Sequence, residues 1–527
     1  MKNWYNLHPY LMVFYPVLFL YAHNISESPI SVIIVPTGII LCVTALLILL
    51  IRIMIRDRLK TGIIVTFFLT LFFSYGNIMV LIETKPVIDF LIYKQLAIVF
   101  YARHKLLTLL WTILYISGVF LIVRTKRDLR NISKILSVAI CSFLVISLLQ
   151  VGLYKFSNRG LWRATTKIKH VHSETTRLAR PDTLRDIYFI VLDGYASSRI
   201  LTDVYDYSNQ NFIDMLTDRG FYVAAESSSN YAHTNLSLAS SLNMNYVQNL
   251  IDIAGVESVD YKMVYQMIYD NKAMNLLRSI GYKFINYPSG SGPSYYNNFA
   301  DLNIRCGGLK EFTVVFIQST MLRPLGELPF FDFLPYGSTR QRILCTFSSL
   351  ASLHKDNEPK FVFAHIISPH PPYVFGANGE KLPIAVMKMT GDIWGEKEDY
   401  VNQLLYINNE IEVVIDEILN NSRIPPIIII QADHGPAATI YDSDNINGWD
   451  NPSSTGLNER MRILNAYYLP AGGDCLLYDS ITPVNNFRIV FNYYFGTNQP
   501  LLKDEIYYSP LDQLYNFAQV TDKINNY

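Results

Sequence analysis

Residues 425–437 read PPIIIIQADHGPA, and this stretch decides the fold class. Four consecutive isoleucines at 427–430 are typical of a strand buried on both faces, because a half-exposed strand would alternate apolar and polar residues. The run ends on Asp433, His434 and Gly435. A strand that only had to stop could end on a turn residue, whereas ligands gather beyond the carboxyl ends of parallel strands. We therefore interpret the acid and the imidazole as part of a site.

Other β-rich runs follow the same plan after residue 183. Segments with helical spacing of apolar residues lie between them, for example 209–220 and 401–421. Apolar strands without alternation, separated by helices, predict a mainly parallel sheet with helices on both faces. We expect this α/β domain to occupy residues 183–527. The expected strands are 186–193, 221–225, 282–287, 360–367, 426–432 and 463–470.

The chain before residue 155 is richer in apolar residues and predicts an α-helical transmembrane domain over 1–155. Five stretches there approach the ~20 apolar residues that cross a hydrocarbon core. The first contains Pro9 and Pro16 and also fits a signal peptide. No small-residue cleavage site follows it, and further spans do, so we favour a retained span. The stretches are 5–22, 31–51, 62–82, 106–124 and 133–154.

Lys and Arg cluster in two short loops, 52–60 and 124–134, whereas the loop after the first span, HNISESPI, has neither. The positive-inside bias places the N-terminus and both basic loops in the cytoplasm, and with five spans everything after residue 155 faces outward. The polar, basic segment 156–182 is interpreted as a tether. The stretch 86–103 is apolar but contains charges, which favours an interfacial helix over a sixth span.

Charge and cysteine content narrow the class of protein. The 44 acidic and 44 basic side chains balance, and without a basic patch that includes aromatic residues we expect no nucleic-acid partner. Cys42 and Cys141 lie in expected spans, and Cys306, Cys345 and Cys475 lie outside them. These three allow at most one disulfide, and no Cys-x-x-Cys metal or redox spacing occurs.

Polar side chains also end two other expected strands. Asp193 closes the run at 186–193, and the segment FVFAHIISPH carries His365 and His370. Taken alone, an Asp-Gly after a strand is most often a turn, and a histidine on a strand is most often a core residue. Together with Asp433 and His434, however, they offer the carboxylate and imidazole ligands that a borderline divalent cation binds.

Thr234, in the segment AHTNLSLASS, is the candidate nucleophile. It follows a polar, turn-rich stretch and precedes a run with helical propensity, so it would lie near a helix N-terminus, where free N–H groups favour an anion. A threonine hydroxyl needs a metal or a base to become nucleophilic. The alternative is that Thr234 only caps the helix, with Ser237, Ser240 and Ser241 forming a small packing face.

These residues resemble the alkaline phosphatase superfamily, in particular its sulfatase-like, membrane-anchored transferases. Lipoteichoic acid synthases and lipid A phosphoethanolamine transferases belong to that branch, and they share the order of spans, tether and outward α/β domain. IIIIQADHG is similar to the family's strand followed by Asp-His-Gly. HIISPHPPY keeps the spacing of the transferases' H-x-x-G-S-H-x-x-Y segment, with Ser368 and Pro369 in place of Gly-Ser. Asp193 stands where the transferases usually have Glu, and the segment around Thr234 matches only loosely.

The resemblance implies one divalent metal ion (Zn, Mn or Mg), bound by Asp193, Thr234, Asp433 and His434. Thr234 would attack phosphorus and form a phospho-threonine, and His370 and His365 would contact the phosphate or protonate the leaving oxygen. Sulfatases carry Cys or Ser in a C/S-x-P-x-R context, which is missing around Thr234. Two-metal phosphatases need a later histidine, but His434 is the last one, so a single metal is expected.

The leading hypothesis is a multi-pass enzyme of the bacterial cytoplasmic membrane with its catalytic domain on the periplasmic side. It would move a phosphoethanolamine- or phosphoglycerol-type head group from a membrane lipid donor to an envelope glycan or lipid. A second hypothesis ends the same chemistry on water, giving a phosphodiesterase, a phosphatase or an atypical sulfatase. A third is a non-catalytic envelope assembly protein whose metal site is structural.

Overall fold

The computed structural model describes residues 6–26, 28–82, 103–157, 177–290, 292–307, 309–327, 335–353, 358–382, 394, 397–440 and 448–525. The chain forms two compact units. Unit 1 combines residues 1–159 with 309–335, and unit 2 combines 160–308 with 336–527. Except for Arg103, the predicted interfacial helix at 86–103 lies outside the described residues, as does most of the predicted tether, at 158–176.

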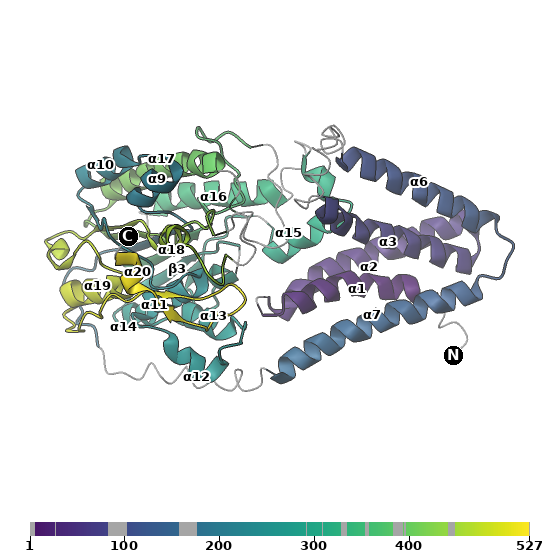
Figure 1. The fold of residues 1–527 in the computed structure, drawn as a ribbon, viewed down its shortest axis with the longest axis horizontal. Helices are drawn as coiled ribbons and strands as arrows, with labels where there is room; N and C mark the ends of the chain where they lie inside the picture. Colours follow the sequence, from purple (N-terminus) through teal and green to yellow (C-terminus); the bar gives the residue numbers. More distant parts are fainter. Residues whose placement is uncertain are drawn as a thin grey trace. The chain divides into compact units, whose positions relative to one another are not determined.

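Unit 1 is built from long apolar helices that coincide with the five expected spans (Figure 1). Within the described part of the chain, four segments are long and apolar enough to cross a membrane: 30–55, 58–82, 104–124 and 130–157. The 16 residues of α1 reach only about 24 Å at 1.5 Å per residue, which is less than a hydrocarbon core of about 30 Å. The fifth span and the orientation therefore stay predictions. The helices are α1 (His8–His23), α2 (Ile34–Ile55), α3 (Arg58–Ile82), α6 (Arg103–Arg124) and α7 (Arg130–Ser157).

Unit 2 contains a seven-stranded sheet in the order β2-β7-β6-β1-β5-β3-β4. The five strands from β6 to β4 are parallel, and β7 runs antiparallel to both β6 and β2. All six expected strands are present, and of the strands in this sheet only the two-residue β4 was not predicted. The strands are β1 (Ile187–Leu192), β2 (Tyr222–Val223), β3 (Lys283–Tyr287), β4 (Leu302–Asn303), β5 (Lys360–Ile366), β6 (Ile427–Gln431) and β7 (Asn465–Tyr468).

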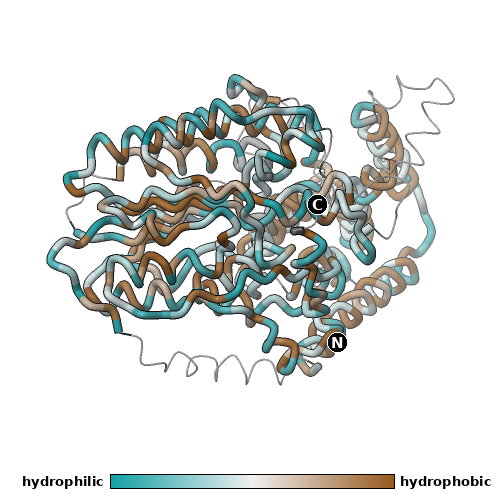
Figure 2. Tube along the Cα trace, turned by 60° about the vertical axis from the view of Figure 1, so that its left-hand side comes forward, coloured by the Kyte–Doolittle hydropathy of each residue, from teal (hydrophilic) through white to brown (hydrophobic). Residues whose placement is uncertain are grey.

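Helices cover both faces of this sheet, and Figure 2 shows the apolar strands as a layer between them. Side chains of β1 alternate between the two cores: Tyr188 and Ile190 join one cluster, and Phe189 and Val191 join the other. The predicted fold class, transmembrane helices followed by a mainly parallel α/β domain, is confirmed. The first cluster includes α9 (Ser198–Tyr205), α10 (Gln210–Asp218), α16 (Pro335–Ser352) and α17 (Lys397–Asn421); the second includes α11 (Thr234–Asn243), α13 (Lys262–Tyr269), α14 (Lys272–Ser279) and α19 (Asn486–Phe495).

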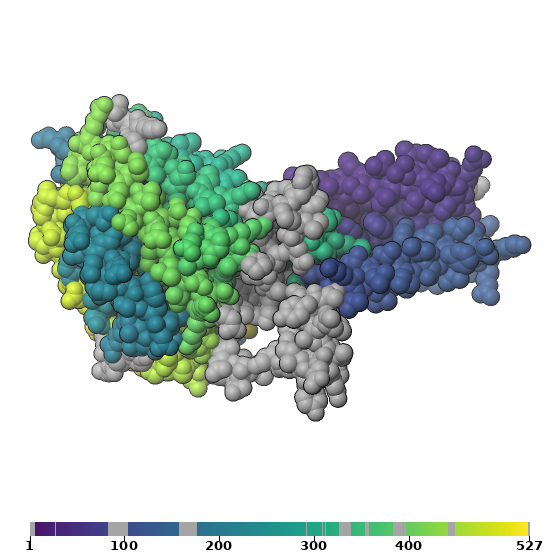
Figure 3. Space-filling model, turned by 90° about the horizontal axis from the view of Figure 1, so that it is seen from above, coloured from purple at the N-terminus to yellow at the C-terminus, as the bar shows by residue number. Residues whose placement is uncertain are grey.

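The predicted helical segment 401–421 forms most of α17, which turns Leu404, Ile411 and Ile418 into the core. On the surface, the green residues of α17 lie beside the blue-teal residues of α9 and α10 (Figure 3). Arg219, just after α10, reinforces this pairing by binding Glu412 and Asp416 on α17 at 2.8 and 2.6 Å.

Cys306 and Cys345 form a disulfide in unit 2. Cys475 is a free, exposed thiol. The expected maximum of one disulfide among the three cysteines outside the spans is therefore reached.

Candidate metal centre and active site

The sheet topology brings the polar strand ends together. Strand β1 pairs with β5 on one side and β6 on the other, and all three are parallel. The register sets Leu192 opposite Ile366 and Val191 opposite Gln431. The residues that follow these strands therefore emerge at one edge, although about 240 positions separate Asp193 from Asp433 in the chain.

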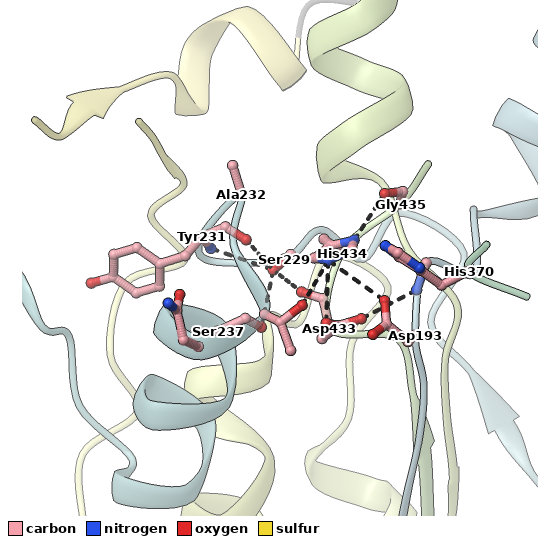
Figure 4. Close-up of polar contacts among 12 residues, drawn as sticks. Asp193, Ser229, Tyr231, Ala232, Ser237, His370, Asp433, His434 and Gly435 are labelled. Atoms are coloured by element: carbon pink, nitrogen blue, oxygen red, sulfur yellow. Dashed lines mark hydrogen bonds and ion pairs between the residues drawn. The ribbon is translucent and has the colours of Figure 1, made fainter. Parts of the chain in front are cut away.

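Asp193, Asp433 and His434 offer one ligand atom each, and these atoms lie within 4.8 Å of one another. His434 Nε2 is 3.3 Å from Asp433 Oδ2 and 3.6 Å from Asp193 Oδ1. Figure 4 shows both carboxylates directed toward the His434 ring. All three side chains are almost fully buried. Two carboxylates held this close in a buried pocket repel each other, which a cation would relieve.

The donor set fits the predicted metal. Among the described residues, Asp193 Oδ1 and Asp433 Oδ2 are buried without a hydrogen-bond partner, which is costly for a carboxylate unless something else binds it. His434 Nδ1–H donates to the carbonyl of Gly435 at 2.9 Å, so its Nε2 lone pair remains for coordination. A backbone carbonyl behind the ligand nitrogen is how metal-binding histidines are oriented in proteins.

Electrostatics agree with that assignment. Burial and the charge of Asp193 raise the pKa of Asp433 to about 6. Burial, and then the charge of Arg460, holds the pKa of His434 well below its usual value, so the ring is neutral and its nitrogen can coordinate. Burial alone would raise the pKa of Asp193, but His370, His365 and His434 together lower it.

Thr234 is the first residue of α11, and its Oγ1 lies 2.9 Å from His434 Nε2. The cap position is His233, so the alternative role of Thr234 as the capping residue is wrong. Ser229 fixes this arrangement, because its Oγ donates to the carbonyl of Asp433 at 2.5 Å and lies 3.2 Å from Ser237 Oγ in α11. Thr234 is half-buried, in contrast to the buried metal-ligand candidates.

His365 and His370 both reach this site but occupy different positions. His365 is buried, with Nε2 3.3 Å from Asp193 Oδ2 and Nδ1 2.5 Å from the hydroxyl of Ser294. Asp193 raises the pKa of His365 against the opposing effect of burial. His370 is half-buried, and its ring centre is 6.3 Å from that of His434. Its Nδ1–H donates to the carbonyl of Pro371 at 2.6 Å, which leaves Nε2 for a substrate.

Arg460, in α18 (Ser454–Met461), also supports the site but was not predicted from the sequence. Its Nε donates to the carbonyl of Ala232 at 2.8 Å, and its Nη1 donates to that of Gly435 at 3.0 Å. Its own carbonyl accepts the N–H of Gly435 at 2.7 Å. Arg460 therefore joins the segment before Thr234 to the segment after His434.

Gly435 must be glycine for this contact, since a Cβ there would lie 2.0 Å from the carbonyl oxygen of Glu459. Glu459, also in α18 and fully buried, accepts hydrogen bonds from the hydroxyl of Tyr205 and from the amides of Ala438 and Thr439. It thereby fixes the loop that follows the metal-ligand candidates. The sequence contained a signal for Glu459 and Arg460, because the run LNERMR (457–462) places three charged residues directly before an expected strand.

Comparison with known proteins gives one family and several distant folds. The sulfatase family model matches residues 161–456. No curated protein sequence matches the chain. One similar solved structure is the C-terminal periplasmic domain of EptC from Escherichia coli in complex with Zn. It shares 13% sequence identity and a TM-score of 0.44, and the match covers 65% of this chain and 100% of that chain. Another is the integral membrane lipooligosaccharide phosphoethanolamine transferase A from Neisseria meningitidis. It shares 14% sequence identity and a TM-score of 0.38, and the match covers 82% of this chain and 87% of that chain. At these identities and scores the solved structures carry no conclusion about function.

Proposed function

We propose, from the premise that this chain belongs to the sulfatase family, that it transfers a phosphate-linked head group from a membrane lipid to an envelope glycan or lipid. As the family resemblance implied, the chain is a sulfatase-like enzyme. One observation carries the finer proposal: Thr234 Oγ1 lies 2.9 Å from His434 Nε2, beside two buried carboxylate oxygens that have no partner among the described residues. A hydroxyl in that position is placed for activation.

Asp193, Asp433, His434 and Thr234 Oγ1 would hold one divalent cation. When bound, the cation would favour the alkoxide of Thr234 and neutralise charge on the phosphoryl group. The metal itself, whether Zn, Mn or Mg, is part of the proposal, as is the assignment of these four residues.

The reaction proceeds in two displacements at Thr234. First, Thr234 Oγ1, present as the alkoxide after its hydroxyl proton has passed to solvent, forms a bond to phosphorus while the bond from phosphorus to the lipid oxygen breaks. His370, whose side chain is half-buried, gives the departing oxygen a proton from Nε2. Second, an acceptor hydroxyl attacks phosphorus and passes its proton to His370 Nε2, and the bond from phosphorus to Thr234 Oγ1 breaks to return the threonine alkoxide. The buried His365 touches Asp193 rather than the open side, so it orients that carboxylate.

Membrane location fits a lipid donor. Among the described residues of unit 1, four helices are long and apolar enough to cross a membrane. We assign residues 1–155 to the membrane, 156–182 to a tether and 183–527 to the catalytic domain. The disulfide between Cys306 and Cys345 supports the outward side, because disulfides persist in oxidising compartments such as the periplasm.

The test uses the purified full chain in lipid nanodiscs that contain phospholipids labelled in the head group. Wild type should gain a covalent mass equal to the phosphorylated head group, and Thr234→Ala should not. Adding acceptor lipid or glycan should remove the adduct. A label that persists in Thr234→Ala would contradict the nucleophile, and release of free head group without acceptor would convert the proposal into a hydrolase.

A further inference from the structure

Residues 309–335 lie inside the part of the chain that matches the sulfatase family, yet they belong to unit 1. The described part of this excursion contains α15 (Glu311–Gln318) and a short 3-10 helix at Arg323–Glu327. The chain therefore leaves unit 2 after residue 308 and returns at residue 336. A loop that only connected two elements of unit 2 would run over the surface of that unit.

The apolar side chains of α15 pack among the helices of unit 1. Phe312 and Phe316 are buried in one cluster with Val65, Leu69 and Phe73 of α3. The ring centres of Phe73 and Phe316 are 5.9 Å apart. Burying two phenylalanines from a segment of this length against a neighbouring helix makes a substantial apolar contact.

The backbone after α15 joins α3 directly. The amide of Gly76 donates to the carbonyl of Ser319 at 3.2 Å, and the amide of Met321 donates to the carbonyl of Phe72 at 3.0 Å. A Cβ on Gly76 would lie 2.4 Å from the Cα of Ser319, so only glycine permits this approach. Met321 also packs against a small buried cluster that contains Tyr75 of α3 and Leu107 of α6. The contact is thus specific in both backbone and side chain.

The backbone hydrogen bonds at Phe72 and Gly76 lie in the half of α3 that ends at Ile82. Gly76 is six residues from the end of the helix at Ile82, about 9 Å at 1.5 Å per residue. The basic residues Arg58 and Lys60 are at the opposite end, which the positive-inside bias places in the cytoplasm. The excursion therefore meets α3 in the outer part of the membrane, as an element of an outward domain must.

A disulfide closes the base of the excursion. Cys306 and Cys345 both belong to unit 2, flank the excursion in sequence, and are bonded across 39 positions. Joining the outgoing and returning chains at one point removes conformational freedom from the segment between them.

We propose that residues 309–327 are a second membrane anchor of the sulfatase-family domain, docked on the outer ends of α3 and α6 and independent of the tether at 156–182. The occupant of this docking surface is the chain's own segment. The proposal concerns attachment only, so it stands or falls separately from the chemistry at Thr234.

The experiment inserts a specific protease site between residues 160 and 176 of the full chain and cleaves it in isolated membranes. The fragment that carries unit 2 should stay in the membrane pellet after a high-salt wash. Gly76→Leu combined with Phe316→Asp should release it into the supernatant. Gly38→Leu is the matched control, because a Cβ at Gly38 of α2 meets nothing within 4 Å.

If the Gly76→Leu and Phe316→Asp double variant fails to insert into the membrane, cross-linking tests the same contact without it. Phe73→Cys with Phe316→Cys, in a chain whose Cys42, Cys141 and Cys475 are serine, should couple the two cleaved fragments through a short bis-maleimide. Gly38→Cys with Phe316→Cys should not. Release of the wild-type fragment after cleavage, or absence of coupling between positions 73 and 316, would overturn the proposal.

Discussion

Replacing Arg460 should weaken metal binding although Arg460 is not itself a ligand. Arg460→Met removes two hydrogen bonds that a charged group donates, to the carbonyls of Ala232 and Gly435. The carbonyl of Gly435 still accepts from His434 Nδ1. The carbonyl of Ala232, two residues before Thr234, loses the bond from Nε.

The size of the effect follows from these contacts. A buried carbonyl that loses its partner costs about 1–3 kcal/mol. If Thr234 must return to its position whenever metal binds, the free energy of metal binding becomes less favourable by the same amount. Each 1.4 kcal/mol raises the metal dissociation constant tenfold. We therefore expect the metal dissociation constant to rise about 10–100-fold, the range found when residues that support metal ligands are replaced. For Arg460→Lys, the metal dissociation constant should lie between those of wild type and Arg460→Met, because one ammonium group cannot reproduce both hydrogen bonds of a guanidinium.

The assay is calorimetric titration of the chelator-stripped full chain with Zn²⁺ or Mn²⁺, together with thermal unfolding. Arg462→Met is the matched control. Arg462 is equally buried, but its side chain binds Glu226, Asn458 and the carbonyl of Ile524, none of which is a ligand candidate. Both variants should lower the melting temperature, but only Arg460→Met should lose metal affinity. Equal loss of metal affinity in both variants, or no loss in Arg460→Met, would show that Arg460 does not support the metal site.

Three further outcomes are expected. The pKa of Asp433 is raised to about 6 from about 3.9 in an unfolded chain, so protonation of Asp433 stabilises the metal-free fold at low pH, and this contribution is lost as pH rises through about 6. Metal affinity, measured across a pH series, should therefore fall below pH 6. Asp433→Asn should bind metal poorly at every pH. Gly435→Ala, whose Cβ would meet Glu459 O at 2.0 Å, should abolish metal binding in the same titration, and unchanged affinity would contradict the close approach. Ser294→Ala, which removes the hydroxyl 2.5 Å from His365 Nδ1, should keep one metal per chain by elemental analysis but lower transfer about tenfold; a lost metal would instead make His365 part of the coordination.

The sequence predicted the parts of this fold that depend on local pattern. The isoleucine run at 427–430 and its neighbours implied buried parallel strands, and parallel strands necessarily gather Asp193, Asp433 and His434 at one edge. The two-residue β4 (Leu302–Asn303) was missed because it is exposed to half-buried and lies in no apolar run, unlike the equally short β2, which lies within FYVAA.

Other features could not be predicted, because they depend on contacts between distant positions. Arg460 reaches Ala232 across 228 residues, and no local pattern reports such a partner. Any two of the three cysteines outside the spans could have paired. The eight residues of α15 are too few for a span and have the composition of a core helix, so their place in unit 1 emerges only from the three-dimensional structure.

The central claim is that four side chains hold one cation beside the hydroxyl of Thr234. Elemental analysis combined with intact mass spectrometry of the full chain, after brief exposure to lipid, tests it most directly. We expect one tightly bound divalent metal per chain and one head-group phosphate adduct, with the metal lost in Asp433→Asn and the adduct lost in Thr234→Ala. A chain that contains no metal, or that carries the adduct on another residue, would contradict it.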